Sequence, residues 1–148
     1  MIVIMMLKSW LWLRIAAVLT LLYCVAHTIG VPWTPVTGPQ EIAVIDAMKA
    51  ARFTILGADR TYWNFYLGFG LIISGYLLVQ AIVLWQLAVI ERRMPGITRT
   101  ISAGFCISFL VNAFFAWRYF FIAPVLFAVA IAICLAIAFH LSLRDQNK

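Results

Sequence analysis

The stretch from Trp63 to Ile90 constrains the fold most, because its 28 residues include no charged side chain. As an α-helix it would be roughly 42 Å long, longer than the bilayer hydrocarbon core of about 30 Å. Across the 148 residues, 66% are hydrophobic, 11% are charged, and the mean hydropathy is +1.03. A soluble domain of this length could not bury so much apolar surface, and disorder requires low hydrophobicity. The class of protein that remains compatible with this composition is a polytopic membrane protein.

Four segments are long and apolar enough to cross a bilayer, since a spanning helix needs about 20 mostly apolar residues. They lie at about 11–29, 63–90, 101–117 and 124–143. The connections Glu91–Gly96 and Arg118–Ala123 are short, which forces neighbouring helices to run antiparallel. No segment shows the alternating polarity of β-barrel strands. We therefore predict an all-α membrane protein of one domain, a four-transmembrane-helix bundle with antiparallel up-down topology.

The long first connection, residues 31–62, is predicted to carry a short amphipathic helix at the outer membrane interface. This helix would run from Gln40 to Leu56. Its apolar face would hold Ile42, Ile45, Met48 and Ile55, and another face would hold Asp46, Lys49 and Arg52. Gly57 is predicted to end the helix, and Asp59 or Thr61 to cap the next one.

Basic residues flank the spans unevenly, and this predicts the orientation because cytoplasmic flanks are enriched in Lys and Arg. With the N-terminus inside, the inner basic residues are Lys8, Arg14, Arg92, Arg93, Arg99, Arg144 and Lys148, and the outer ones are Lys49, Arg52, Arg60 and Arg118. Tryptophan prefers the membrane interface. Trp10, Trp12 and Trp85 fall at the inner level, and Trp33, Trp63 and Trp117 at the outer level. Both tests predict that the two termini are cytoplasmic.

A cleaved signal peptide is an alternative for the first apolar segment. The region before it carries one basic residue, Lys8, and Cys24-Val25-Ala26 is a passable cleavage site. We expect instead that the segment is retained as a span.

Cysteines and histidines do not indicate a cofactor. Cys24, Cys106 and Cys134 lie in three different spans, and none forms the Cys-x-x-Cys pair that a membrane thiol–disulfide oxidoreductase needs. His27 lies near the outer end of the first span and His140 near the inner end of the fourth, which disfavours a bis-histidine haem within one chain. Because the basic residues are divided between two membrane faces, nucleic-acid binding is also disfavoured. We predict no catalytic residues, no metal and no cofactor.

Polar and small side chains within the spans indicate which helix faces point into the bundle, because polar groups are costly when they face lipid. Small residues also let helix backbones approach closely. The predicted inward stripes are Thr20, Cys24 and His27; Asn64, Gly68, Gly75 and Gln86; Gly104, Ser108 and Asn112; and Ala128, Ala132 and Ala136. Such small-residue faces could also hold a second copy of the chain or a partner membrane protein.

A ligand pocket on the outer side is a competing interpretation of some of these residues. Three polar side chains lie in the outer halves of their helices, a basic residue ends the third span, and the first loop can add two arginines. The candidate binding residues are His27, Arg52, Arg60, Asn64, Asn112 and Arg118. Arginine can hold a carboxylate or phosphate, and histidine titrates near neutrality. The ligand would be a membrane lipid or an isoprenoid-like molecule, with its tail among Phe65, Phe69, Phe114 and Phe115.

The segment of about residues 46–86 is also similar to a group of known proteins. The matching residues are Met48-Lys49, Arg52-Phe53, Gly57, Arg60, Tyr62-Trp63-Asn64-Phe65-Tyr66, Gly68-Phe69-Gly70 and Leu84-Trp85-Gln86. This segment resembles a group of small uncharacterised bacterial membrane proteins with four predicted helices, over roughly a third of the chain. The resemblance implies a bacterial inner membrane and no particular activity.

Three functions are compatible with these observations. The first is a non-catalytic accessory or interaction component of the membrane. The second is a lipid-binding or small lipophilic ligand-binding protein, with or without enzymatic activity, that uses the outer pocket. The third is a transporter or channel. The absence of charges from the last three spans and the small number of helices disfavour a conducting path in a monomer, so this function is compatible only as one subunit of an oligomer.

Overall fold

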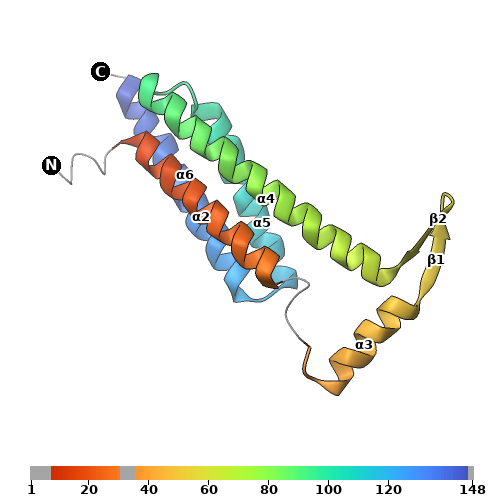
Figure 1. The fold of residues 1–148 in the computed structure, drawn as a ribbon. Helices are drawn as coiled ribbons and strands as arrows, with labels where there is room; N and C mark the ends of the chain where they lie inside the picture. The colour runs from red at the N-terminus through yellow and green to blue at the C-terminus, as the bar shows by residue number, and fades with distance from the viewer. Residues whose placement is uncertain (1–7, 31–35, 147–148) are drawn as a thin grey trace. The chain divides into compact units, whose positions relative to one another are not determined.

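A computed structural model describes residues 8–30 and 36–146, and side chains as far as Arg144. Within these residues, four helices are long and apolar enough to span a membrane (Figure 1). They are α2 (Ser9–Gly30), α4 (Tyr62–Arg93), α5 (Arg99–Tyr119) and α6 (Ile122–Gln146). The prediction of four helices long and apolar enough to span is confirmed, and each helix is a few residues longer than predicted. Trp33 and Lys148, which entered the prediction of orientation, lie outside the described residues.

The chain divides into two compact units. The first contains α2 as far as Tyr23, α4 from Leu77 onwards, and all of α5 and α6. The second runs from Cys24 to Tyr76 and contains the remaining turns of α2 and α4. It also contains the helix α3 (Pro39–Ala50) and the strands β1 (Arg52–Ile55) and β2 (Ala58–Thr61).

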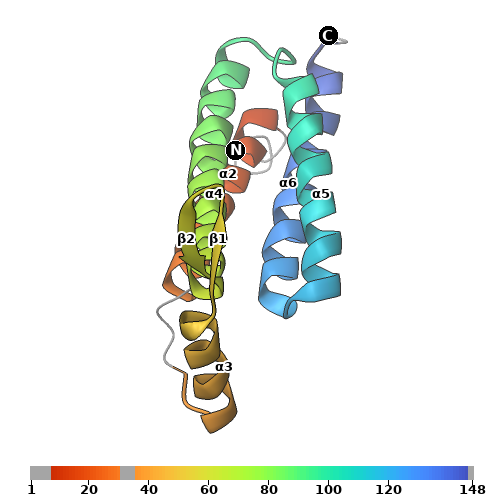
Figure 2. The same ribbon diagram turned by 90° about the vertical axis from the view of Figure 1, so that its right-hand side faces the viewer.

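In the first unit, contacts between distant residues fix the helix directions. Ser9 at the start of α2 hydrogen-bonds Glu91 near the end of α4. Tyr23, further along α2, contacts Asn112 of α5 and stacks on Phe127 near the start of α6. Consecutive helices therefore run in opposite directions in this unit, and α5 and α6 lie side by side as a hairpin (Figure 2).

The core of the first unit is apolar and rich in alanine. The core residues Leu13, Ala16, Leu84, Ala88, Ala128, Ile131 and Leu135 are at most 1% exposed. Alanines at helix contacts allow the backbones to approach closely, which strengthens packing where lipid provides little hydrophobic driving force. The α5–α6 connection is short because Phe120 is extended and Pro124 suits the first turn of the next helix.

The prediction for the first loop was wrong in its second half, as the structure of the second unit shows. The expected helix from Gln40 to Leu56 ends at Ala50, and the residues after it form an antiparallel hairpin that pairs Arg52 with Thr61 and Ile55 with Ala58. Leu56 and Gly57 make the turn with φ values of 50° and 80°. Positive φ at both central residues is the signature of a type I′ turn, the usual two-residue hairpin connection. Phe53-Thr54-Ile55 also favours a strand, because aromatic and β-branched residues suit a sheet.

The predicted inward stripes are confirmed only in part. Thr20 and Cys24 on α2 and Ala128 and Ala132 on α6 are buried. The stripe on α5 was assigned to the wrong face, since Gly104, Ser108 and Asn112 are exposed. The buried face of α5 holds Ser102, Phe109, Ala113 and Ala116. Phe109 fills the interior and the alanines admit close neighbours, so packing volume determined the buried face of this helix. Asn64, Gly75 and Gln86 on α4 and Ala136 on α6 are exposed too, and Gly68 is only half-buried.

Candidate functional site

Two of the predicted ligand residues, Arg60 and Asn64, line a common groove in the second unit. The groove has a volume of about 240 Å³ and is completed by Phe65, Gly68, Phe69 and Ile72. Thr61 and Asn64 form a reciprocal cap at the start of α4. Backbone N–H of Thr61 donates to Asn64 Oδ1 at 2.9 Å, and backbone N–H of Asn64 donates to Thr61 Oγ1 at 3.2 Å. Of the two predicted cap residues, Asp59 and Thr61, it is Thr61 that caps α4, and the amide of Asn64 has a structural role.

His27 belongs to a group of hydrogen bonds between α2 and α4 within the second unit. Its Nε2 lies 3.1 Å from the Gly70 carbonyl oxygen, which also accepts from Ser74 Oγ at 3.2 Å. Thr28 Oγ1 donates to Ser74 Oγ at 2.9 Å, and Cys24 Sγ donates to the Ser74 carbonyl at 3.3 Å. Because a carbonyl oxygen only accepts hydrogen bonds, this contact assigns the proton to Nε2. In the neutral imidazole, Nδ1 is then the acceptor.

The other three predicted ligand residues do not line this groove. Arg52 is exposed in β1. Asn112 and Arg118 belong to the first unit. There, Asn112 Oδ1 accepts a long hydrogen bond of 3.5 Å from the Tyr23 hydroxyl, and the Arg118 guanidinium lies 5.2 Å from the centroid of the Tyr119 ring.

Among the charged side chains that the structure describes in the first unit, Glu91 is the most enclosed, and it was not among the predicted site residues. It is 1% exposed. Its Oε1 accepts from Ser9 Oγ at 2.8 Å and from backbone N–H of Gly96 at 2.9 Å. Its Oε2 accepts from Thr98 Oγ1 at 2.8 Å and, at 3.4 Å, from backbone N–H of Thr98. Glu91 thus ties the α4–α5 turn to the start of α2. The sequence did contain a signal for this role of Glu91. It is an acidic residue shortly before the turn Pro95-Gly96, which is followed by Thr98.

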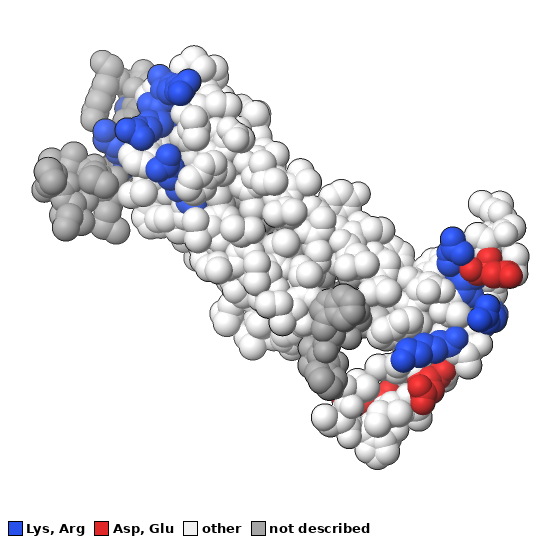
Figure 3. Space-filling view, in the orientation of Figure 1, with Lys and Arg blue, Asp and Glu red and all other residues white. Residues whose placement is uncertain are grey.

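Beside this network lies a basic–aromatic cluster, which comprises Trp10, Arg14, Trp85 and Arg92. The Arg14 guanidinium lies 5.2 Å from the ring centroid of Trp10 and 5.0 Å from that of Trp85, and the Arg92 guanidinium lies 5.3 Å from that of Trp10. Arg14 Nε is buried and has no hydrogen-bond partner. Cation–π contacts of this kind contribute about 0.5–2 kcal/mol each. Lysines and arginines gather at this end of the first unit, which Figure 3 shows in blue.

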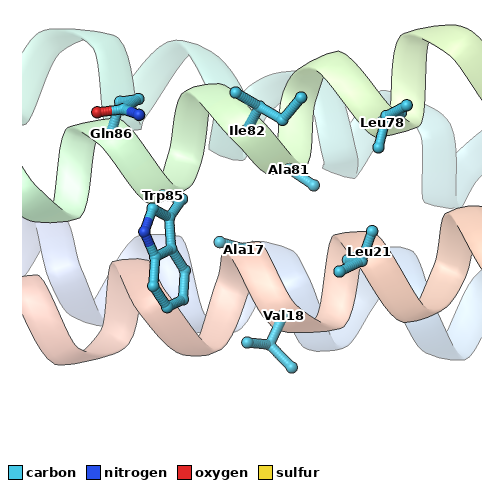
Figure 4. Close-up of a pocket in the computed structure, with 8 residues that line it drawn as sticks. All are labelled: Ala17, Val18, Leu21, Leu78, Ala81, Ile82, Trp85 and Gln86. Carbon is cyan, nitrogen blue, oxygen red and sulfur yellow. The ribbon is translucent and has the colours of Figure 1, made fainter.

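A groove runs between α2 and α4 from the same cluster. It has a volume of about 220 Å³, and Trp85 and Gln86 lie at one end of it. The remaining lining residues are Ala17, Val18, Leu21, Leu78, Ala81 and Ile82. Figure 4 shows the Trp85 ring extending from α4 towards α2, with the two alanines on facing sides of the gap. Polar groups in the lining are the amide of Gln86 and the indole N–H of Trp85.

Within the described residues, no group of three or more His, Cys, Asp or Glu side chains could hold a metal ion. All three cysteines are free thiols. Comparison of the chain with protein-family models, curated proteins and solved structures finds no match.

Proposed function

We propose that the chain is a non-catalytic interaction component of a bacterial inner membrane, with both termini in the cytoplasm. It would associate with a second copy, or with another membrane protein, through the α5 stripe of Gly104, Ser108 and Asn112. The observation that carries this proposal is the exposure of the stripe on a helix that is apolar enough to span a membrane.

Contact with lipid is unfavourable for the polar side chains of the α5 stripe. The amide of Asn112 has one long hydrogen bond within the chain, from the Tyr23 hydroxyl. Facing hydrocarbon, the Ser108 hydroxyl and the remaining donors of Asn112 find no solvent partner, whereas a neighbouring helix can hydrogen-bond them. A Cβ added to Gly104 would meet nothing within 4 Å. This glycine is therefore not required for packing within the described chain, and it leaves room for the backbone of another helix. Polar contacts between membrane helices contribute about 0.6 kcal/mol on average, so the association also needs close packing.

Gly104→Leu tests this association in the full chain, purified in mild detergent. We expect the wild type to give dimers or larger assemblies by native mass spectrometry and crosslinking. The leucine should remove most of them, because it fills the space a partner backbone would occupy. Gly75→Leu is the matched control, since Gly75 is an exposed glycine of α4 with nothing within 4 Å of an added Cβ. A monomeric wild type with no co-purifying partner would refute the proposal, and loss of assembly only in Gly75→Leu would move the contact to α4.

The groove lined by Arg60 and Asn64 supports a second candidate, the binding of a lipophilic ligand with an anionic head group. Its Phe65 and Phe69 walls are apolar, and Arg60 offers a charged donor at its edge. Arg60→Ala should lower the amount of co-purified lipophilic ligand detected by mass spectrometry. Thr61→Ala is the control, because it removes the α4 cap but keeps both groove side chains. Equal ligand content in Arg60→Ala and wild type would exclude the groove.

A further inference from the structure

We propose that the groove between α2 and α4, together with Arg14 and Arg92, binds one anionic phospholipid. The phosphate would lie at the basic–aromatic cluster, and one acyl chain would lie in the groove. This site belongs entirely to the first unit and is separate from both the α5 stripe and the groove at Arg60.

The first argument is the charge of Arg14. This residue lies in the second turn of a helix that is long and apolar enough to span a membrane, where an uncompensated charge is costly. The nearby carboxylate of Glu91 is occupied by Ser9, Gly96 and Thr98, and none of its hydrogen bonds comes from Arg14. Arg14 Nε is buried and unpaired. Arg14 as a whole is only half-buried, so an anion supplied from outside the chain would compensate the charge of its guanidinium.

The second argument is that two guanidinium groups share one aromatic ring. Arg14 and Arg92 both lie against the Trp10 ring, so two positive charges belong to the same small basic–aromatic cluster. A phosphate group accepts several hydrogen bonds from arginine, whose planar fork matches its geometry. At the edge of a bilayer, the phosphates in greatest supply are those of lipid head groups, and basic clusters at this level attract anionic lipids.

The third argument is the shape and chemistry of the groove. Ala17 and Ala81 leave a gap between the two helices, and Leu21 and Leu78 continue it away from the cluster. Apart from the Gln86 amide and the Trp85 indole N–H, the lining is apolar, and an apolar lining suits a hydrocarbon chain. Trp85 lines the groove and also contacts Arg14, so the charged and apolar parts of the site are continuous. Only a ligand with an anionic head and an apolar tail fits both parts.

Native mass spectrometry of the delipidated full chain in mild detergent tests the site. The probes are phosphatidylglycerol and phosphatidylcholine with identical acyl chains. We expect wild type to retain phosphatidylglycerol preferentially. Arg14→Gln should lower its retention about tenfold, as expected for loss of a charge-assisted hydrogen bond. Arg144→Gln is the control, because it removes one charge from α6, which does not line the groove. It should change retention by less than about twofold.

Two further variants keep the test decisive if Arg14→Gln fails to fold. Arg92→Gln and Ile82→Trp change exposed side chains. The first weakens the phosphate site, and the second fills the groove, so both should lower phosphatidylglycerol retention. Equal retention of both lipids by the wild type, or equal losses in Arg92→Gln and Arg144→Gln, would overturn the proposal. So would a dimer that Ile82→Trp abolishes without changing lipid retention, because a second copy would then occupy the groove.

Discussion

At the scale of single residues, Glu91 couples three parts of the chain. Its two carboxylate oxygens satisfy the Ser9 hydroxyl at the start of α2, the backbone of the Pro95-Gly96 turn, and Thr98 just before α5. Hydrogen bonds to a charged acceptor are stronger than neutral ones, and a buried donor left without an acceptor costs about 1–3 kcal/mol. A buried acid of this kind therefore contributes mainly by holding two helix ends and a turn in one geometry.

Glu91→Ala should lower the free energy of unfolding by about 2–4 kcal/mol, because it leaves several buried donors unpaired. Glu91→Gln should cost less, since its amide oxygen still accepts. Thermal unfolding in mild detergent, followed by circular dichroism, measures the difference. Glu41→Ala, at an exposed position in the first turn of α3, is the control and should stay within about 0.5 kcal/mol of wild type. If Glu91→Ala unfolds at the same temperature as the control Glu41→Ala, the hydrogen bonds of Glu91 have no structural role.

At the scale of elements, the hairpin of β1 and β2 carries an identifiable strain. Leu56 adopts a φ of 50°, which costs an ordinary L-residue about 1 kcal/mol or more, while asparagine tolerates it better and the φ of 80° at Gly57 suits glycine. Leu56 is also fully exposed, so it gains no burial in return. The turn therefore has one favourable and one unfavourable residue.

Leu56→Asn should stabilise the hairpin by about 0.5–1 kcal/mol, because Asn-Gly is a preferred pair for a type I′ turn. Gly57→Ala should weaken it by a similar or larger amount. Hydrogen exchange of the amides between Arg52 and Thr61 reports both changes directly. Slower exchange in Gly57→Ala, or faster exchange in Leu56→Asn, would contradict the assigned turn.

The elements differ in how far the sequence predicted them. The apolar helices were predictable because length and hydropathy decide them locally, and Thr61 was one of two residues whose position suited a cap. The hairpin was missed because Arg52 continued the three-residue spacing of Asp46 and Lys49, a helical signal that the turn at Gly57 overrides. The outward stripe of α5 and the partners of Glu91 depend on contacts between residues far apart in sequence, which periodicity within one helix does not contain. Of the six predicted ligand residues, Arg60 and Asn64 line the same groove at the start of α4.

At the scale of the whole molecule, charge placement is the basis of the proposed orientation. The hydrogen bonds of Glu91 to Ser9 and Thr98 join the start of α2, the end of α4 and the start of α5. Four basic residues of the first unit lie at these three helix ends. These are Lys8, Arg92, Arg93 and Arg99. The basic residues of the second unit are accompanied by Glu41, Asp46 and Asp59. Since Lys and Arg near short loops are retained on the cytoplasmic side, the network end should be inside. The phospholipid of the proposed site would then come from the cytoplasmic leaflet, where anionic head groups meet juxtamembrane arginines.

Cysteine labelling with a membrane-impermeant maleimide tests this orientation in spheroplasts. The background should carry alanine at Cys24, Cys106 and Cys134, all of which lie inside spans. Leu56→Cys in the hairpin should label in intact spheroplasts. Met94→Cys in the α4–α5 turn should label only after the membrane is opened. Both positions are exposed in the structure, so a difference between them reports the membrane and not burial within the protein. The reverse pattern would place the basic end outside, contradict the charge rule, and move the lipid site to the outer leaflet.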